Sequence, residues 1–374
     1  MTADATRART VDVSILVNTC RRPRHLDLVL ESIALQRGVA GRFEVVVADA
    51  AADDETAAVI RDHAARAEFP LRSTSRPHDG FRLSRTRNDA ARQARGDYLL
   101  FLDGDCMIPP HHVAAHLSRR RPGTALVGYC ARLPEETCRT LERGDLSHVN
   151  LPALVPADER RALRRRWRRF RWHGIVRHPT KPRLTGGDFG VWRRDFEQVN
   201  GFDERFVGWG QEDDDLGLRL RDVGVRLESI LDRTSSLHVW HAPDATAPTR
   251  WRDGPNVAYF SRRGRLSACR QGLAPRPTTA ILWGLPTDVE ATPLGRGLAA
   301  LLATAPQAAP GTGCEIEIVV RPGRGRFHRA AECRLLVSAA GAIVEPGLRA
   351  AADHVAVAET DRETSLAAIL DAAG

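Results

Sequence analysis

The residues with the strongest chemical character are 208–215, which read GWGQEDDD. Consecutive carboxylates repel one another, and a helix start can hold them because its free N–H groups and its dipole favour negative charge. The apolar residues that follow predict such a helix. Glycines on both sides of Trp209 let a ligand approach the backbone, and the indole can stack on a sugar ring. A simple acidic cap is the alternative, but the preceding GG turn and NGFDE segment favour a binding or catalytic site.

A second acidic motif, Asp103-Gly104-Asp105, directly follows the apolar run YLLFL. Two carboxylates separated by one small residue can share a hard divalent cation with phosphate oxygens. His238 and His241 are spaced so that both imidazoles can approach a metal from one segment. Carboxylates combined with imidazole suit Mn²⁺ better than Mg²⁺, which prefers oxygen ligands. The alternatives are a turn that ends a strand and structural histidines.

Other polar residues offer contacts to a nucleotide. Asp49 can accept hydrogen bonds from a base or ribose, or it can cap the next helix. Arg85 and Arg87 can meet a diphosphate through their forked donors. The motifs GxxxxGK[ST], GxGxxG and GxSxG are absent, which argues against a P-loop ATPase, a dinucleotide oxidoreductase and an α/β hydrolase.

Apolar runs of strand length alternate with segments of helical spacing in the first hundred residues. Strands are predicted at 11–17, 43–48, 71–75 and 98–102, with helices near 25–36, 53–67 and 88–95. The alternation predicts a mostly parallel sheet covered on both faces, in which ligands bind beyond the carboxyl ends of the strands. We expect Asn18-Thr19, Asp49 and the Asp103-Gly104-Asp105 motif to converge there.

The rest of the chain divides into three stretches. Residues 125–183 are interrupted by prolines and are interpreted as loop and helix over the site, and strand character returns at 226–240. A boundary is predicted near 274–277, followed by a small Ala-rich α/β domain without a catalytic motif. Its predicted strands are 279–283, 314–320, 334–337 and 354–358, and its helices lie near 297–304 and 364–373.

The chain has 374 residues and a net charge of +8, much of it in the run RRALRRRWRRFR at 160–171. A solvated basic helix face is the simplest interpretation of this run. Peripheral contact with an anionic membrane is the next, with Trp167, Phe170 and Trp172 as interfacial anchors. Nucleic acid is the least favoured partner because no recognised nucleic-acid module accompanies the run.

The seven cysteines are scattered and form no CxxC pair. We expect Cys20, Cys106 and Cys130 to be buried free thiols, which indicates a reducing compartment. No apolar run is long enough to span a membrane, and the first residues lack the apolar centre of a signal peptide. The predicted location is the cytoplasm, with peripheral attachment at the inner face of the membrane as an option.

Taken together, several segments resemble the family 2 glycosyltransferases of the GT-A fold over residues 11–260, roughly two thirds of the chain. The second half is similar to the C-terminal region of β-1,4-galactosyltransferases, as in bacterial chondroitin-type polymerases. The segments that carry the resemblance are SILVNTCRRPRHLDLVLESI, EVVVADAAADDET, RTRNDAARQARGDYLLFLDGDC, TGGDFGVWRRDFEQVNGFDERFVGWGQEDDDL and HVWH.

The resemblance implies an α/β fold of the GT-A class, a Rossmann-like mixed sheet flanked by helices, with a small additional C-terminal α/β domain. The expected parts are a disordered tail (1–10), a glycosyltransferase domain (11–265) and a domain of unknown role (275–374). Within the glycosyltransferase domain, residues 11–125 would bind the nucleotide sugar and residues 180–245 the acceptor. NTC at 18–20 and AA at 50–51 depart from the family's commoner Pro-Thr-Tyr and Gly-Ser, which affects the expected base and ribose contacts.

The implied activity is metal-dependent, inverting transfer of a hexose or N-acetylhexosamine from a UDP-sugar to a glycan hydroxyl, as in polysaccharide biosynthesis. Asp213 would be the catalytic base with Glu212 beside it, and Mn²⁺ or Mg²⁺ would bind Asp105, His238 and His241. The donor would contact Thr19, Arg22, Asp49, Arg85, Arg87, Asp103 and Asp105. The acceptor would contact Gly187, Trp209, Glu212, Asp213 and Asp214.

Other functions fit parts of this pattern. A peptide or a small natural product can replace the glycan as acceptor. A non-catalytic module that binds sugar or nucleic acid can use the same scaffold, although it would not need a base and metal ligands together. A nucleotidyltransferase also pairs carboxylates with Mg²⁺ at strand ends, and release of pyrophosphate would identify it.

Overall fold

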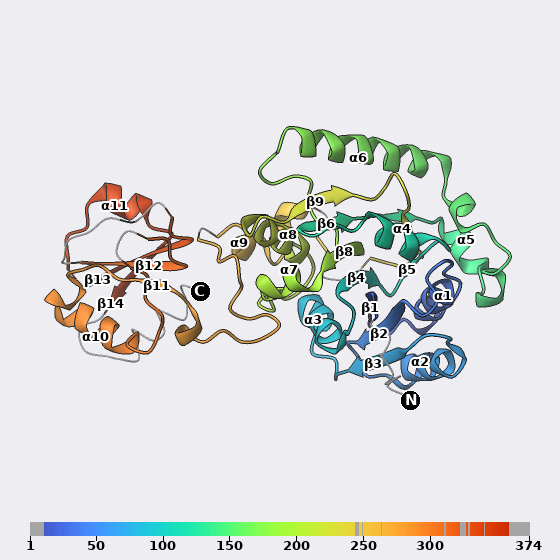
Figure 1. Ribbon diagram of the computed structural model, residues 1–374, viewed down its shortest axis with the longest axis horizontal. Helices are drawn as coiled ribbons and strands as arrows, with labels where there is room; N and C mark the ends of the chain where they lie inside the picture. Colours follow the sequence, from blue (N-terminus) through green and yellow to red (C-terminus); the bar gives the residue numbers. More distant parts are fainter. Residues whose placement is uncertain are drawn as a thin grey trace, which may run out of the picture. The chain divides into compact units, whose positions relative to one another are not determined.

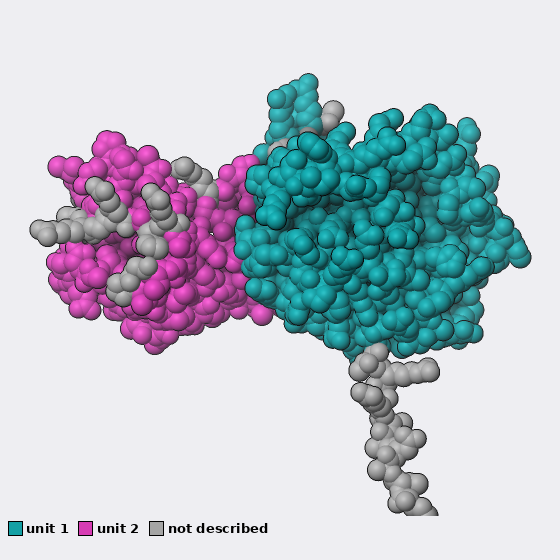
Figure 2. Space-filling view, turned by 45° about the horizontal axis from the view of Figure 1, so that its top comes forward, with its two compact units in different colours: residues 1–257 teal, residues 258–374 magenta. Residues whose placement is uncertain are grey.

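The computed structural model describes residues 11–243, 247–248, 250–262, 264–309, 312–321, 327, 330–339 and 341–358. The predicted tail (1–10) and the predicted helix near 364–373 lie outside these residues. The chain forms two compact units, Met1–Val257 and Ala258–Gly374, coloured separately in Figure 2. The division falls earlier than the boundary predicted near 274–277, because Leu266 already packs in the core of the second unit with Ile281 and Trp283.

The first unit is built on a seven-stranded sheet of order β3-β2-β1-β4-β8-β6-β9. β8 runs antiparallel to its neighbours β4 and β6, while the other paired strands of this sheet are parallel. The sheet is therefore mixed but mostly parallel, as predicted. Its strands are β1 (Val13–Thr19), β2 (Phe43–Asp49), β3 (Leu71–Ser75), β4 (Tyr98–Asp103), β6 (Thr124–Val127), β8 (Asp188–Trp192) and β9 (Arg226–Ser229).

Helices cover both faces of this sheet (Figure 1). On one face lie α1 (Pro23–Ala34), α2 (Asp54–Arg66) and α4 (His112–Arg119); on the other lie α3 (Leu83–Gln93), α7 (Arg193–Gln198) and α8 (Glu212–Asp222). Ile15 and Val45 belong to the core beneath the first set. On the opposite face Phe101 stacks on Phe189 with ring centroids 4.6 Å apart, next to Phe196 of α7. The predicted α/β class with flanking helices is confirmed.

Helix α3 begins earlier than the predicted residue 88. Its buried face is polar and includes Ser84, Thr86, Arg87 and Asn88. Apolar spacing cannot reveal such a face, so the pattern indicated only the second half of the helix.

A small three-stranded sheet of order β5-β10-β7 completes the first unit together with several short elements. Its strands are β5 (Cys106–Met107), β7 (Cys130–Arg132) and β10 (Ser236–His238). The other elements are α5 (Glu135–Thr140), α6 (Ala157–Ile175), α9 (Val257–Phe260), which crosses the division between the units, and 3-10 helices at Arg143–Asp145, Leu151–Leu154 and Trp251–Asp253.

The arginine run lies on α6, which packs beside β9. Phe170 is the one buried residue of this helix, whereas Trp172 is 62% exposed. The expectation that Phe170 is an interfacial anchor is therefore wrong, because its ring points inward. Within the described ranges, no helix combines the length and apolarity needed to cross a membrane.

The second unit contains a four-stranded parallel sheet of order β11-β12-β13-β14. β14 has the predicted bounds, while β11 is shorter than the predicted 279–283 because Thr278–Ala280 forms a 3-10 turn. The elements are β11 (Trp283–Gly284), β12 (Ile316–Arg321), β13 (Cys333–Ala339), β14 (His354–Ala358), α10 (Pro293–Leu301), α11 (Pro346–Ala351) and a 3-10 helix at Val289–Ala291.

All seven cysteines are free thiols. Cys106 is buried as predicted, but Cys20 and Cys130 are half-buried. Cys20 follows the end of β1 and Cys130 begins the short β7, so both lie at strand ends.

Candidate active site

The carboxyl ends of β1, β2 and β4 meet at one edge of the sheet, as the sequence predicted. The strand register sets Thr19 opposite Asp49 and Asn18 opposite Asp103. The side-chain oxygens of Asn18 and Thr19 are buried there without a hydrogen-bond partner in the described part of the chain. Buried oxygens without partners are costly, so this edge is prepared for a polar ligand.

Asp49 does not cap the helix that follows it. Asp53 caps α2 instead, because its carboxylate accepts from the N–H of Thr56 at 2.8 Å. Asp49 accepts from the N–H of Ala51 at 3.0 Å, and burial raises its pKa. Asp49 therefore remains a candidate for contact with a nucleoside.

Gly104 sets the directions of the two aspartates beside it. Its N–H donates to the carbonyl of Asn18 at 2.8 Å, and a Cβ at Gly104 would lie 2.6 Å from that oxygen. The backbone approach therefore requires glycine. As a result Asp103 faces Arg87, whereas Asp105 faces His238, at the end of β10, and His241.

Asp105, His238 and His241 form a candidate metal site. Nε2 of His241 lies 3.1 Å from Oδ2 of Asp105, and Nε2 of His238 lies 3.7 Å from Oδ1. One ligand atom from each residue lies within 4.8 Å of the others, so the group fits a divalent cation. The pairing of β5 with β10 sets His238 opposite Cys106 and so brings the motifs together.

Positive charge surrounds the carboxylate of Asp105. Burial raises its pKa, but the hydrogen bond from His241 and the charges of His238, His241 and Arg22 lower the pKa below its usual range. Arg22 donates to Oδ2 of Asp105 at 2.8 Å. Asp105 is therefore ionised at neutral pH, as a metal ligand must be.

Arg87 is the buried centre of the site, with 2% of its side chain exposed. Its guanidinium donates to Asp103 at 2.9 Å and to Asp213 at 2.7 Å, and Glu212 lies 3.7 Å away. These carboxylates raise the pKa of Arg87 despite its burial. One arginine thus joins the strand-end motif to the start of α8.

Helix α8 starts from a backbone that only glycine adopts easily. Gly208 and Gly210 have φ values of +81° and +95°, and Gln211, the residue before the helix, has φ +73°. Asn256 fastens this loop, because its side-chain amide donates to the carbonyl of Gly210 at 2.9 Å and accepts from the N–H of Val207 at 3.2 Å. Sequence reasoning missed Asn256, which belongs to no motif.

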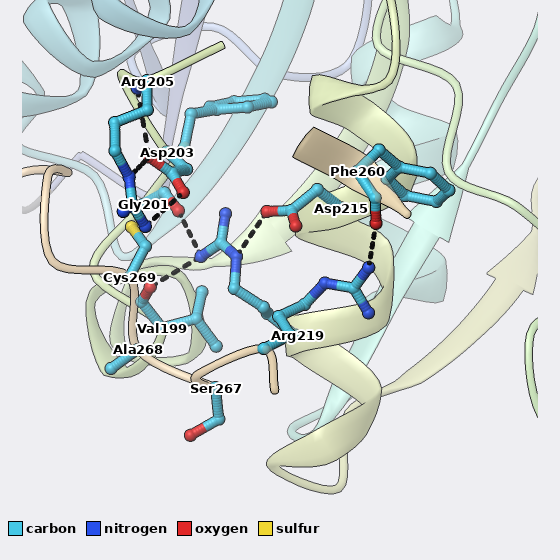
Figure 3. Close-up of polar contacts among 12 residues, drawn as sticks. Val199, Gly201, Asp203, Arg205, Asp215, Arg219, Phe260, Ser267, Ala268 and Cys269 are labelled. Carbon is cyan, nitrogen blue, oxygen red and sulfur yellow. Dashed lines mark hydrogen bonds and ion pairs between the residues drawn. The ribbon is translucent and has the colours of Figure 1, made fainter. Parts of the chain in front are cut away.

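Each carboxylate at the start of α8 has an arginine partner. Besides the contacts of Arg87, Asp214 pairs with Arg183 at 3.1 Å and Asp215 with Arg219 at 2.7 Å. Figure 3 shows Arg219 also reaching the carbonyls of Val199 and Gly201, each at 2.7 Å. The helix start alone therefore does not compensate the four acids. No spacing in the sequence links Arg87 or Arg183 to these four acids.

The two carboxyls nearest to Arg87 hold protons more tightly than usual. Burial, together with the charge of Asp213, raises the pKa of Glu212 to about 8. Burial and the charge of Asp103 also raise the pKa of Asp213. Asp213 is thereby a stronger base than an exposed aspartate, which suits it to accept a proton near neutral pH.

Gly186 holds the base in place. Its N–H donates to Oδ2 of Asp213 at 2.9 Å, and a Cβ on Gly186 would lie 2.2 Å from Oδ1 of that carboxylate. Gly187 is packed against Asp103, since a Cβ on it would lie 2.9 Å from Oδ2 of Asp103. The GG turn therefore positions both carboxylates of the site.

We expect Gly186→Ala to lower kcat by on the order of 10²-fold, because the added methyl group must displace Asp213 from its position. Gly144→Ala is a matched control, since nothing lies within 4 Å of a Cβ added there. Initial rates and thermal unfolding of both variants test this prediction. Equal rates for the two variants would show that the position of Asp213 is not critical.

The ionisation of Glu212 gives a second prediction. Its pKa of about 8 means that it is protonated at neutral pH and adds a negative charge beside Asp213 only above that pH. Activity should fall at acidic pH as Asp213 becomes protonated, and the rate profile should show a further inflection near pH 8. Glu212→Gln should remove this inflection and keep the acidic decline. An inflection that persists in Glu212→Gln would assign it to another group.

The remaining predicted residues are placed as follows. Trp209 is 39% exposed on the glycine loop, where a ligand can stack on its ring. Asp214 also lies at the start of α8 but points to Arg183. Arg85 pairs with Asp79 at 3.2 Å on the exposed side of α3. The structure therefore does not bring Arg85 together with Arg87, whose side chain leaves the opposite side of the helix.

Residues 14–178 match the family model described as glycosyl transferase family 2, and residues 177–241 match the model described as the N-terminal domain of galactosyltransferase. The second match contains the GG turn, the start of α8 and the HVWH motif. Residues 14–178 are thus similar to the family 2 glycosyltransferases, and residues 177–241 to a galactosyltransferase-type second part, as the resemblance implied.

Several curated proteins are similar to this chain. A validoxylamine A glucosyltransferase of Streptomyces hygroscopicus is 29% identical over 233 residues, which are 57% of this chain and 52% of the relative. The hyaluronan synthase of Pasteurella multocida is 24% identical over 59% of this chain and 24% of the relative. The chondroitin synthase of Escherichia coli is 23% identical over 58% and 33%. The chain thus spans about half the length of the first relative and less of the others.

Solved structures also show similarity. A mannosyltransferase from Pyrobaculum calidifontis, in complex with GDP-Man and Mn²⁺, is 18% identical with a TM-score of 0.43, over 67% of this chain and 62% of that one. S. aureus TarS 1-349, in complex with UDP-GlcNAc, is 15% identical with a TM-score of 0.42, over 66% and 64%.

Proposed function

We propose that the chain transfers a sugar from a UDP-sugar to a hydroxyl group of a glycan acceptor, with inversion at the anomeric carbon. The observation that carries this proposal is the bridge made by Arg87 between Asp103 and Asp213. It joins the nucleotide edge of the sheet to a carboxylate with a raised pKa. One connected set of side chains thereby contacts the donor site and positions a base for the acceptor.

The reaction follows from the roles of these residues. Asp213 accepts the proton of the acceptor hydroxyl as its oxygen bonds to the anomeric carbon. The bond from that carbon to the diphosphate breaks, and UDP leaves with the electron pair. Arg87 and the N–H of Gly186 fix the carboxylate, so part of the rate comes from positioning. Attack on the face opposite to the leaving group inverts the anomeric centre.

Other residues hold the donor. Thr19, Asp49 and Asp103 line the strand ends where the UDP moiety would lie. A divalent cation bound by Asp105, His238 and His241 would neutralise the charge that develops on the departing diphosphate. The imidazole ligands favour Mn²⁺ over Mg²⁺. Arg22, which is 33% exposed beside Asp105, is placed to contact the diphosphate.

Two acceptor classes remain to be distinguished. The names of the hyaluronan and chondroitin synthases support a glycan, and Trp209 provides a surface on which a sugar ring can stack. The name of the validoxylamine A glucosyltransferase favours a small natural product as the second candidate. Assays with oligosaccharides and with validoxylamine A as acceptors separate these two classes. A non-catalytic module is disfavoured because base and metal ligands occur together.

Binding of UDP tests the donor and metal assignments. We expect UDP to bind in the presence of Mn²⁺ and to lose most of its affinity when EDTA is added. Asp105→Ala should weaken Mn²⁺-dependent binding by on the order of 10²-fold, because a metal ligand is lost. Asp62→Ala, which removes a half-exposed carboxylate on α2, is the matched control. Titration calorimetry measures both variants, and equal UDP affinity with Mn²⁺ and with EDTA would contradict the metal site.

Peripheral membrane contact is a separate proposal, based on α6. The helix combines arginines with the exposed Trp172 and Ile175, the latter 67% exposed. Sedimentation with vesicles of anionic and of neutral lipid tests it. Binding to the anionic vesicles alone is expected. No binding to either would show that α6 is a solvated basic helix face without membrane contact.

A further inference from the structure

A second cluster of metal-ligating side chains lies inside the first unit, outside the set assigned to the reaction. His112 and His116 are four residues apart on α4, so both imidazoles lie on one face of the helix. Asp188, the first residue of β8, faces them. All three side chains are 0% exposed.

The three side chains converge through atoms that have no other partner. Oδ1 of Asp188 lies 3.2 Å from Nε2 of His112 and 3.6 Å from Nε2 of His116. None of these three atoms has a properly directed hydrogen bond within the described residues. Buried polar atoms are almost always satisfied, so three unsatisfied ones at one point need an explanation.

The outer atoms of the imidazoles are held in a defined orientation. Nδ1 of His112 lies 2.9 Å from the hydroxyl of Thr234, and Nδ1 of His116 lies 3.4 Å from that of Tyr98. A hydroxyl can accept from Nδ1–H, which leaves the lone pair of Nε2 directed at the cluster. Burial lowers the pKa of His116, which favours its neutral form.

The carboxylate of Asp188 is oriented in the same way. Its Oδ2 accepts from the hydroxyl of Ser236 at 3.0 Å and from the N–H of Ser236 at 3.2 Å. Gly128 makes room for it, because a Cβ on Gly128 would lie 2.4 Å from the carboxylate carbon. Outer hydrogen bonds that orient each ligand are the usual surroundings of a protein-bound metal.

We propose that His112, His116 and Asp188 bind a structural Zn²⁺ ion. Two imidazoles and one carboxylate are the protein donors of zinc sites in which water supplies the fourth ligand, whereas Mg²⁺ and Ca²⁺ prefer oxygen ligands. One ligand atom from each residue lies within 4.8 Å of the others, as in the Asp105 group. Unlike the Asp105 group, this cluster is fully buried. It would therefore keep its metal through purification, and the metal would not contact substrate.

The role of this metal follows from the elements it joins. It would fasten α4 to the start of β8, the strand that directly follows the GG turn. Gly186 in that turn donates to Asp213. The ion would therefore stabilise the first unit and support the position of the base, without contact with donor or acceptor. The metal assignment itself does not depend on the proposed function.

The test measures metal in the full chain, purified without a polyhistidine tag and dialysed against EDTA. We expect about one tightly bound zinc per chain by elemental analysis. The His238→Ala/His241→Ala double variant should keep it, because it removes only the Asp105 group. His116→Gln and Asp188→Asn should lose it. Zinc that stays in both of these variants, or is lost with the double variant, would overturn the assignment.

A second measurement covers the case in which the variants do not fold. The wild-type chain is unfolded with a strong chelator and refolded with Co²⁺, whose visible absorption reports a low-coordinate site with nitrogen and oxygen ligands. We expect this absorption also in the His238→Ala/His241→Ala double variant, its absence when Zn²⁺ is present before refolding, and a lower melting temperature for chain refolded without metal. The proposal would be overturned if wild-type chain grown with zinc contains none and melts at the same temperature after refolding with and without metal. Protons on the histidines would then compensate the charge of Asp188.

Discussion

Asp213→Asn should lower kcat by about 10²- to 10⁴-fold, the usual contribution of a general base. Asparagine keeps the size of the side chain and one oxygen, which can accept from either Gly186 or Arg87 but not from both, and it cannot take the proton of the acceptor. UDP binding with Mn²⁺ should be unchanged, because the donor contacts lie at the strand ends. Steady-state kinetics and titration calorimetry on the same samples measure the two effects.

Asp214→Asn is the matched control for this change. Its carboxylate is the next one along α8 but points to Arg183 instead of Arg87. A much smaller loss of kcat is expected for it, although its exposed edge can still contact the acceptor. Equal losses for the two variants would indicate that the acidic run acts as a whole, and that Asp213 has no special role.

Arg87→Leu should lower the free energy of unfolding by about 3–5 kcal/mol, because removing one partner of a buried ion pair leaves uncompensated charge. Asp103, Asp213 and Glu212 would then face each other without a cation. Arg85→Leu, on the same helix but 40% exposed, should cost less than about 1 kcal/mol. Urea unfolding of both variants measures the difference.

The pH dependence of Arg87→Leu gives an independent check. Without the arginine, the folded-state pKa values of Glu212 and Asp213 would lie further above their unfolded values. The folded chain would then bind more protons than the unfolded chain, so its stability would fall as pH rises. The deficit relative to wild type should therefore grow from acidic to neutral pH. A deficit that is constant with pH would attribute the loss to packing alone.

The sequence predicted those parts of the site that follow directly from strands and motifs. An apolar run such as YLLFL identifies a buried strand, and parallel pairing then places Asp49 and Asp103 at the same edge of the sheet, on either side of β1. The HVWH spacing likewise indicated that two imidazoles approach one point. These inferences hold because an apolar run and a short spacing involve neighbouring residues, and parallel pairing brings the carboxyl ends of the strands to one edge of the sheet.

The remaining features depend on contacts between distant segments. Arg87 and Arg183 neutralise the start of α8 from other elements, and Asn256 holds its glycine loop. The buried face of α3 is polar, so apolar spacing did not predict the first half of this helix. His112 and His116 did show helical spacing in the sequence, but only the fold places Asp188 between them.

The most direct test of the account is release of the nucleotide from a panel of sugar nucleotides, UDP-sugars and GDP-sugars, with Mn²⁺ and with EDTA. Slow transfer to water reports the donor without any acceptor. We predict UDP release from one UDP-sugar, dependent on Mn²⁺ and lost in Asp105→Ala and Asp213→Asn. Release only from GDP-sugars would show that the donor is a GDP-sugar instead of a UDP-sugar. UDP binding without release from any donor, even with the acceptor panels present, would contradict the catalytic assignment.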